Sequence, residues 1–294
     1  MTDAQGWRRK FGVLGPSTNT IVQPDYEAMR PIGVTNHYSR IYTPNASAMS
    51  NESARAATEV IAGNTMDAVR SVMTCEPDYM VMGMSAVTFF GGAKGADKFI
   101  QSIKDECGLD VSIGSHACSA ALRAYGGVKK SAIVSPYWPS MNVEVIGYFR
   151  DMGFDVVRDV ALQCQSWINI AEVTTATLRQ TLRQLDGDDV DAIVQIGTNM
   201  SMVELAAAAE LWLGKPVVAI NTATYWHALR ANGITEKKQG FGRLVTNETG
   251  ATAQRVLATM VQNIAVAEQT DNLLCQDTGV PIYNLWIGKG VEVD

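Results

Sequence analysis

The segments DYMVMGMSAV (residues 78–87) and DAIVQIGTNM (residues 191–200) follow one plan. Each starts with an aspartate, continues as a short run rich in Val, Ile and Met, and ends in a turn of small and hydroxyl residues. A short apolar run that is bounded by turn residues is typical of a buried strand in a parallel sheet. Because the chain carries this unit twice, the sequence indicates two similar halves.

Two further pairs of segments repeat in the same order. FGVLGPSTNT (residues 11–20) resembles SAIVSPYWPS (residues 131–140), since each is a strand pattern followed by proline and a polar turn. VSIGSHACSAALRA (residues 111–124) resembles VVAINTATYWHALRA (residues 217–231), since each is a strand pattern followed by a helix that ends in Ala-Leu-Arg-Ala. The three pairs together predict a duplicated α/β fold with equivalent strand ends facing each other across a cleft.

The rest of the chain alternates short apolar runs with segments of helical period, as expected for a parallel α/β architecture. The expected strands are 11–15, 79–84, 110–114, 131–135, 154–158, 190–196 and 216–220. The expected helices are 51–73, 93–106, 118–125, 140–151, 174–185, 202–213, 223–232 and 249–269.

The composition is that of an ordinary globular enzyme. The 294 residues carry a formal net charge of −6, with 18% charged and 47% hydrophobic residues. No basic block could neutralise phosphates, which argues against a nucleic-acid or membrane-surface partner. No signal peptide and no bilayer-spanning apolar stretch is visible, so we expect a cytoplasmic protein.

The cysteines and histidines indicate neither disulfides nor a metal site. The five cysteines lack a CxxC pair, and no two of the three histidines stand four residues apart on a helix. Scattered, odd-numbered cysteines are typical of free cytosolic thiols. A zinc site is therefore not expected.

Polar side chains without positive charge follow the expected strands. In open parallel sheets, ligands bind beyond the carboxyl ends of the strands, where helix N-termini present backbone N–H groups. The residues at these ends suit a small anion held by neutral donors: Ser17, Thr18, Asn19, Ser85, Ala86, His116, Tyr137, Thr198, Asn199, Asn221 and Thr222.

GVLGPSTNT (12–20), SPYWPSMN (135–142) and LWLGKPVVAINTATYWHALRANGI (211–234) resemble motifs of the Asp/Glu racemase superfamily, in its maleate isomerase and arylmalonate decarboxylase branch. The resemblance implies two Rossmann-like parallel-sheet domains related by pseudo-two-fold symmetry, with the active site between them and no cofactor. It divides the chain into residues 1–117 plus 223–294 and residues 118–222. It also implies a homo-oligomer that acts on a small molecule.

The family places one cysteine at the end of each equivalent strand, and the resemblance puts Met84 and Gly197 at those two positions. The paired-cysteine mechanisms therefore do not transfer directly, because they need an acid and a base, or a thiolate nucleophile. The binding frame is implied to remain. Its substrate-binding residues would be Ser17, Asn19, Met84, Ser85, Ala86, Gly197, Thr198 and Asn199, and Tyr137 would reach the same carboxylate. QSWINI (165–170) would offer Trp167 as an aromatic wall.

His116 and Tyr137 are the candidate catalytic acid/base residues. His116 is expected at a strand-to-helix turn on the cleft side, and its pKa type is near neutrality. It could instead cap the helix expected to begin near Cys118, a residue that could be either a lowered-pKa thiol or a packing residue. His37 falls in an expected loop, VTNHYSRIYTP, that would cover the cleft, and His227 falls in a helix, where packing is the simpler role.

Three functions remain open. The first is a cofactor-independent enzyme for a small carboxylate, with proton-transfer isomerase or decarboxylase-like chemistry. The second is a hydrolase of a small cyclic amide or related compound that uses an activated water. The third is a non-catalytic protein that binds small carboxylates. The orientation of His116 relative to Asn19 and Tyr137 would discriminate among them.

Overall fold

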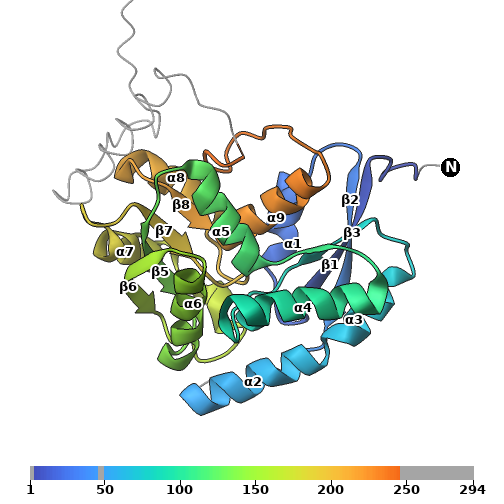
Figure 1. Ribbon diagram of the computed structural model, residues 1–294, viewed down its shortest axis with the longest axis horizontal. Coiled ribbons are helices and arrows are strands. Elements are labelled where there is room, and N and C mark those ends of the chain that lie inside the picture. Colours follow the sequence, from blue (N-terminus) through green and yellow to red (C-terminus); the bar gives the residue numbers. More distant parts are fainter. Residues whose placement is uncertain (1–2, 46–49, 246–294) are drawn as a thin grey trace, which may run out of the picture. The chain divides into compact units, whose positions relative to one another are not determined.

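The computed structural model describes residues 3–45 and 50–245. They contain two four-stranded parallel sheets, which Figure 1 shows as separate groups of strands. The first sheet has the order β2-β1-β3-β4, with β1 Arg9–Pro16, β2 Val34–Ile41, β3 Tyr79–Met82 and β4 Val111–Ser112. The second has the order β6-β5-β7-β8, with β5 Lys130–Ser135, β6 Asp155–Ala161, β7 Ala192–Gln195 and β8 Val217–Ala219.

The two sheets have the same strand order in the same chain sequence, which confirms the predicted duplication. The register agrees as well, since Leu14 pairs with Met82 in the first sheet and Val134 pairs with Gln195 in the second. The fold is therefore α/β, with two Rossmann-like halves related by pseudo-two-fold symmetry.

Helices connect the strands throughout the described residues. They are α1 Val22–Met29, α2 Asn51–Gly63, α3 Thr65–Met73, α4 Gly92–Cys107, α5 Gly114–Tyr125, α6 Pro139–Asp151, α7 Thr175–Leu185, α8 Val203–Leu213 and α9 Ile220–Ala231. The short 3-10 helices are η1 Ala86–Thr88 and η2 Asn169–Glu172. Within 3–45 and 50–245, no helix has the length and apolar character needed to cross a bilayer.

The central strand β3 of the first sheet is apolar along its whole length because both of its faces are covered. Tyr79 and Val81 pack in the same apolar cluster as Tyr225 of α9, whereas Met80 and Met82 belong to the other main cluster. Successive side chains of a strand point to opposite faces. The helix that follows the second sheet, α9, therefore returns to cover the first one.

All the expected strands are present, with ends that shift by at most three residues. The sequence did not predict β2, whose residues 35–38 are only partly buried. Polar residues at consecutive positions hide the alternation that normally reveals a strand. The interpretation of residues 34–41 as a loop over the cleft is therefore wrong. His37 lies inside β2, with its Nε2 2.9 Å from Thr35 Oγ1.

Two helix expectations also need correction. The helix expected over 51–73 is broken at Asn64, which ends α2 and precedes α3, and whose side chain donates to the Tyr42 carbonyl at 2.9 Å. The helix expected from Cys118 begins at Gly114. A Cβ at Gly114 would stand 2.6 Å from Cδ1 of Ile220, so glycine permits the close approach of α5 and α9. The helix expected over 249–269 lies outside the described residues.

Candidate functional site

A cavity lies beyond the carboxyl ends of β1, β3, β5 and β7. Both halves contribute to it, as the duplicated fold predicts. Its lining residues are Pro16, Thr18, Asn19, Ile61, Met84, Ser85, Ala86, Tyr137, Trp167, Ile170, Gly197, Thr198 and Asn199.

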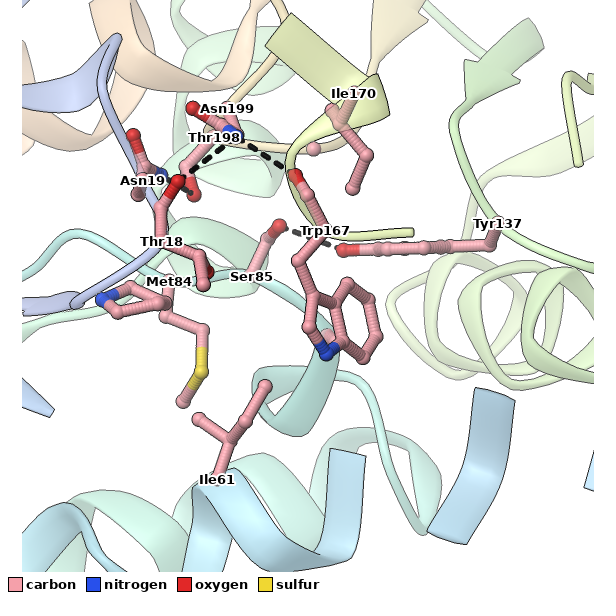
Figure 2. Close-up of a pocket in the computed structure, with 13 residues that line it drawn as sticks. Thr18, Asn19, Ile61, Met84, Ser85, Tyr137, Trp167, Ile170, Thr198 and Asn199 are labelled. Atoms are coloured by element: carbon pink, nitrogen blue, oxygen red, sulfur yellow. Dashed lines mark hydrogen bonds between the residues drawn. The ribbon is translucent and has the colours of Figure 1, made fainter. Parts of the chain in front are cut away.

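Two hydroxyl groups meet across the cavity. Ser85, after β3, and Tyr137, after β5, share a hydrogen bond of 2.7 Å between Oγ and the phenol oxygen (Figure 2). The two groups carry two protons, and one proton serves this bond. The other remains available to an oxygen of a ligand.

The Tyr137 phenol is positioned to donate rather than to accept a proton. Burial raises its pKa, and the bond with Ser85 offsets only part of that effect. Its backbone N–H donates to Ser135 Oγ at 3.2 Å. Ser135 in turn donates to Asn142, whose amide donates to Asp159 at 2.6 Å. This chain of bonds fixes the start of the segment that carries the phenol.

Asn19 joins the two halves at the polar end of the cavity. Its Nδ2 donates to Thr198 Oγ1 at 3.0 Å, while its Oδ1 accepts the backbone N–H groups of Ile21 and Val22 at the start of α1. Since Thr198 accepts this bond, its own hydroxyl proton has no acceptor among the described residues and is available to a ligand. The same holds for one N–H of the Asn19 amide.

The side chain of Asn199 is occupied by the protein itself. Its Oδ1 accepts the Thr20 N–H at 2.9 Å, and its Nδ2 donates to the Trp167 carbonyl at 2.9 Å. Asn199 thus ties the segment after β1 to the segment that carries the indole. Its contribution to the site is to hold this frame.

Two amide side chains hydrogen-bond to backbone carbonyls of the turn after β7. Gln195 Nε2 donates to the Gly197 carbonyl at 2.7 Å, and Asn221 Nδ2 donates to the Thr198 carbonyl at 2.9 Å. Asn221 also donates to Asp25 on α1 at 2.7 Å. Burial raises the pKa of Asp25 to about 6, with the Asn221 bond opposing the shift.

The backbone of the two turns adds further donors. The N–H groups of Ser85 and Thr198 have no acceptor in the part of the chain that the structure describes. Unpaired backbone N–H groups are strong donors for an oxyanion. A carboxylate or enediolate at this end of the cavity would therefore meet several neutral donors.

The opposite end of the cavity is apolar. Ile61 of α2, Met84 and the Trp167 ring line it, as Figure 2 shows. Figure 2 shows the indole between the Ser85–Tyr137 bond and Ile61. The cavity has therefore a polar end suited to an acid group and an apolar end suited to the rest of a small molecule.

Residues 42–245 match the family model described as arylmalonate decarboxylase. The chain belongs to this family. The maleate isomerase of Pseudomonas putida is 28% identical over 253 residues, which cover 81% of this chain and 97% of that protein. The arylmalonate decarboxylase of Bordetella bronchiseptica is 27% identical over 167 residues, which cover 56% and 69%.

A solved structure shares the fold. Maleate cis-trans isomerase of Nocardia farcinica with a covalently bound succinylcysteine intermediate has a TM-score of 0.73 at 21% identity, and the match covers 82% of this chain and 99% of that one. Residues 226–294 also match a model described as fumarate hydratase (Fumerase), and those beyond 245 lie outside the described residues. The resemblance to the maleate isomerase and arylmalonate decarboxylase branch is confirmed, and these relatives support isomerase or decarboxylase chemistry.

Most residues that the sequence assigned to an arylmalonate decarboxylase-type site come together in the cavity. They are Asn19, Met84, Ser85, Ala86, Tyr137, Gly197, Thr198 and Asn199. Ser17 is not among the lining residues, because its hydroxyl is hydrogen-bonded at the end of β2, donating to the Thr43 carbonyl at 3.3 Å. The sequence reasoning missed Ile61 and Ile170 as lining residues, since nothing local distinguishes them from other apolar helix residues.

His116 does not lie at the cavity. It stands in the first turn of α5, with its Nε2 3.3 Å from Asp97 on α4 and its ring 6.1 Å from that of Tyr148. The expected cleft-side position followed from placing the helix start four residues too late. Burial lowers the pKa of His116, which favours its neutral form.

The described lining residues include no cysteine, histidine, carboxylate or cation. Cys118 is fully buried in α5, and burial raises its thiol pKa. Cys164 is nearer in sequence to Trp167, and burial raises its pKa to about 11. Nor does the described part of the chain bring together three groups of the kind that hold a metal ion.

Proposed function

We propose that this protein is an isomerase or decarboxylase for a small carboxylic acid, acting through an enediolate-type intermediate. The observation that carries the proposal is the pair of hydroxyls of Ser85 and Tyr137, 2.7 Å apart in a buried cavity, facing the turn of Thr198. Preorganised donors aimed at a developing oxyanion are the largest single contribution in many enzymes of this kind.

The neutral donors would stabilise the negative oxygens without a positive charge. In a decarboxylation, the bond between the α-carbon and one carboxylate breaks, carbon dioxide leaves, and the electron pair spreads onto the remaining carboxylate. The free proton of the Ser85–Tyr137 pair and the Thr198 hydroxyl would bind those oxygens. The α-carbon then takes a proton from water, and the hydroxide that is left combines with the carbon dioxide to give bicarbonate. In an isomerisation, a water molecule would take the proton from carbon and return it to the same carbon or to its neighbour.

The thiol step of the relative with the succinylcysteine intermediate is not part of this proposal. No described cysteine lines the cavity. The Tyr137 phenol, with its raised pKa, stays protonated and serves as a hydrogen-bond donor, not as a base at neutral pH.

The proposal is tested with the purified chain and a panel of acids. The panel contains phenylmalonate, phenylacetate, maleate and fumarate, because the relatives are maleate isomerases and arylmalonate decarboxylases and residues 226–294 match a fumarate hydratase model. Stabilisation in a thermal-shift assay identifies ligands. Turnover in deuterated water then reports carbon dioxide release, cis-trans conversion or deuterium at carbon.

A binding protein without catalysis is the second candidate. It is favoured by the lack of an ionisable group other than the Tyr137 phenol among the described lining residues. Under this alternative, acids stabilise the protein but no product and no deuterium incorporation appears. Tyr137→Phe would then weaken binding without changing any rate above background.

A further inference from the structure

The indole N–H of Trp167 is a hydrogen-bond donor without an acceptor. The residue is 9% exposed and lines the cavity, and its Nε1 is buried with no partner within the described residues. Trp138 differs, because its Nε1 donates to the Cys164 carbonyl at 3.3 Å. A buried donor left unpaired is destabilising, so this position is unfavourable until an acceptor arrives.

The protein holds the indole in this position. Asn199 Nδ2 donates to the Trp167 carbonyl at 2.9 Å, and the same side chain is fixed by the Thr20 N–H at 2.9 Å. The backbone that carries the ring is therefore connected to both halves of the molecule. A tryptophan that served only as an apolar wall would need no such placement of its N–H group, because phenylalanine would present the same face.

The donor lies at the apolar end of the cavity. In Figure 2 the indole nitrogen is on the side of the ring that faces Ile61, away from the Ser85–Tyr137 bond. Ile61 and Met84 line this end, and no Lys or Arg is among the described lining residues. A second carboxylate at this end would lose its hydration water and gain only one N–H donor, which is strongly unfavourable. A neutral carbonyl oxygen needs only one donor.

We propose that the ligand of this cavity is a small carboxylic acid that carries a neutral oxygen acceptor, such as a ketone, at its far end, and that Trp167 Nε1 donates to this oxygen. The inference rests on the proposed function, since it takes the acid group to lie against Ser85, Tyr137 and Thr198. It adds the substrate class: an oxo acid rather than a dicarboxylate or a purely apolar acid. Trp167 is then a specificity-determining residue.

The test compares three acids by calorimetry: 4-oxopentanoate, pentanoate and butanedioate. They have similar lengths and differ at the fourth carbon, which is a ketone, a methylene group or a carboxylate. We expect 4-oxopentanoate to bind about tenfold more tightly than pentanoate, the ratio that one net hydrogen bond gives. Trp167→Phe should remove that preference, so that the two acids bind with equal affinity.

Trp212→Phe is the matched control. The Trp212 Nε1 is also buried without an acceptor among the described residues, but Trp212 lies on α8 and does not line the cavity. This variant should keep the wild-type preference. In ¹⁵N-labelled wild-type protein, the Trp167 indole N–H signal, assigned by its loss in Trp167→Phe, should shift with 4-oxopentanoate more than with pentanoate.

The outcomes are distinguishable. Equal affinity of the wild type for 4-oxopentanoate and pentanoate, or an equal loss of both in Trp167→Phe, overturns the assignment of the donor while leaving the acid site intact. A preference for butanedioate that Trp167→Phe abolishes overturns the neutral-acceptor class. If none of the three acids and no member of the earlier panel binds, the proposed function fails, and this inference fails with it.

Discussion

The turn after β3 and the turn after β7 occupy equivalent places in the two halves but are built differently. Gly83 N–H donates to Leu14 O at 2.6 Å and Ile196 N–H donates to Val134 O at 2.8 Å, so Met84 and Gly197 are equivalent by register. Met84 places a long apolar side chain at the cavity. Gly197 has a φ of 109°, and a Cβ there would stand 2.6 Å from two carbons of Pro136.

The hydrogen bonds that hold the two turns also differ. Carbonyls of the β7 turn are held by the side-chain amides of Gln195 and Asn221, whereas the β3 turn contributes Ser85, whose hydroxyl meets Tyr137. Each turn also bonds to the opposite half, Ser85 to Tyr137 and Thr198 to Asn19. Both turns therefore keep a bond to the opposite half and a hydroxyl for the ligand, and only the β7 turn has its carbonyls held by side-chain amides as well.

The largest effect should come from breaking the hydroxyl pair at the β3 turn. Tyr137→Phe and Ser85→Ala should each lower kcat/KM by about 10²–10³-fold, the loss typical of one oxyanion donor. Their effects should be less than additive in the double variant, because the two groups share one bond. Steady-state kinetics on the substrate found in the panel measures this.

Tyr148→Phe is the control for the hydroxyl pair. Tyr148 is also a buried tyrosine, hydrogen-bonded at 3.4 Å to Ser119 and absent from the cavity lining. It should keep the wild-type rate. Unchanged kinetics in Tyr137→Phe would show that the β3 turn does not carry the chemistry.

The next prediction concerns Asp25 of α1, which accepts a hydrogen bond from the same Asn221 side chain that holds the Thr198 carbonyl of the β7 turn. The folded-state pKa of Asp25, about 6, lies above the value near 3.9 of an unfolded aspartate. The protonated form is therefore favoured by folding: the stabilisation is complete below about pH 4 and is lost as the pH rises through 6. This loss amounts to about 3 kcal/mol of unfolding free energy.

Asp25→Asn removes this titration. The charge of Glu204 raises the pKa of Asp25, and the hydrogen bond from Asn221 lowers it. Both residues are kept unchanged, so the variant differs from the wild type only at position 25. Urea unfolding at pH 4, 5, 6 and 7 should show that the stability difference between the two proteins changes steadily with pH. A constant difference would contradict the raised pKa.

Gly197→Ala should destabilise the protein by about 2 kcal/mol, through its left-handed φ together with the contact with Pro136. Gly153→Ala shows the cost of a positive φ alone, because the φ of Gly153 is 86° and nothing lies within 4 Å of an added Cβ. Gly153→Ala should cost about 1 kcal/mol. Equal losses in urea unfolding would show that Pro136 moves aside and that the β7 turn is less rigid than its bonds imply.

The smallest effect is expected from thiol modification. None of Cys75, Cys107, Cys118 and Cys164 lines the cavity. Alkylation with iodoacetamide under native conditions should change ligand affinity less than about twofold, well below the tenfold that 1.4 kcal/mol gives. Mass spectrometry identifies the modified residues, and a loss of affinity that tracks one of these four would reveal a thiol contribution that neither turn explains.

Local sequence patterns were sufficient for the fold where burial is two-sided, as in β3 and β7, because a continuous apolar run has few alternative structures. They failed at β2, whose exposed edge carries polar residues. The cavity residues on turns were predictable from the strand ends. Ile61 was not, because its place in the cavity depends on the packing of α2.

The incorrect placement of His116 also arose where local sequence patterns are insufficient. Its placement required the start of α5 to within one turn, and helix ends are the least certain part of a sequence-based prediction. Because α5 begins four residues earlier than expected, the His116 side chain lies beside Asp97 and not at the cavity. The bond between Asn199 and Trp167 was equally out of reach, since it joins residues 32 positions apart through tertiary packing.

Asn19 makes the first turn of α1 an internal reporter of occupancy. One side chain holds the N–H groups of Ile21 and Val22 and also bonds to Thr198 at the cavity. Opening of this helix end by local unfolding therefore disassembles the polar end of the site as well. Ligand that binds only the closed form slows the exchange of these two amide hydrogens by the factor 1 + [L]/Kd, so their exchange rates alone measure affinity without any assay of turnover.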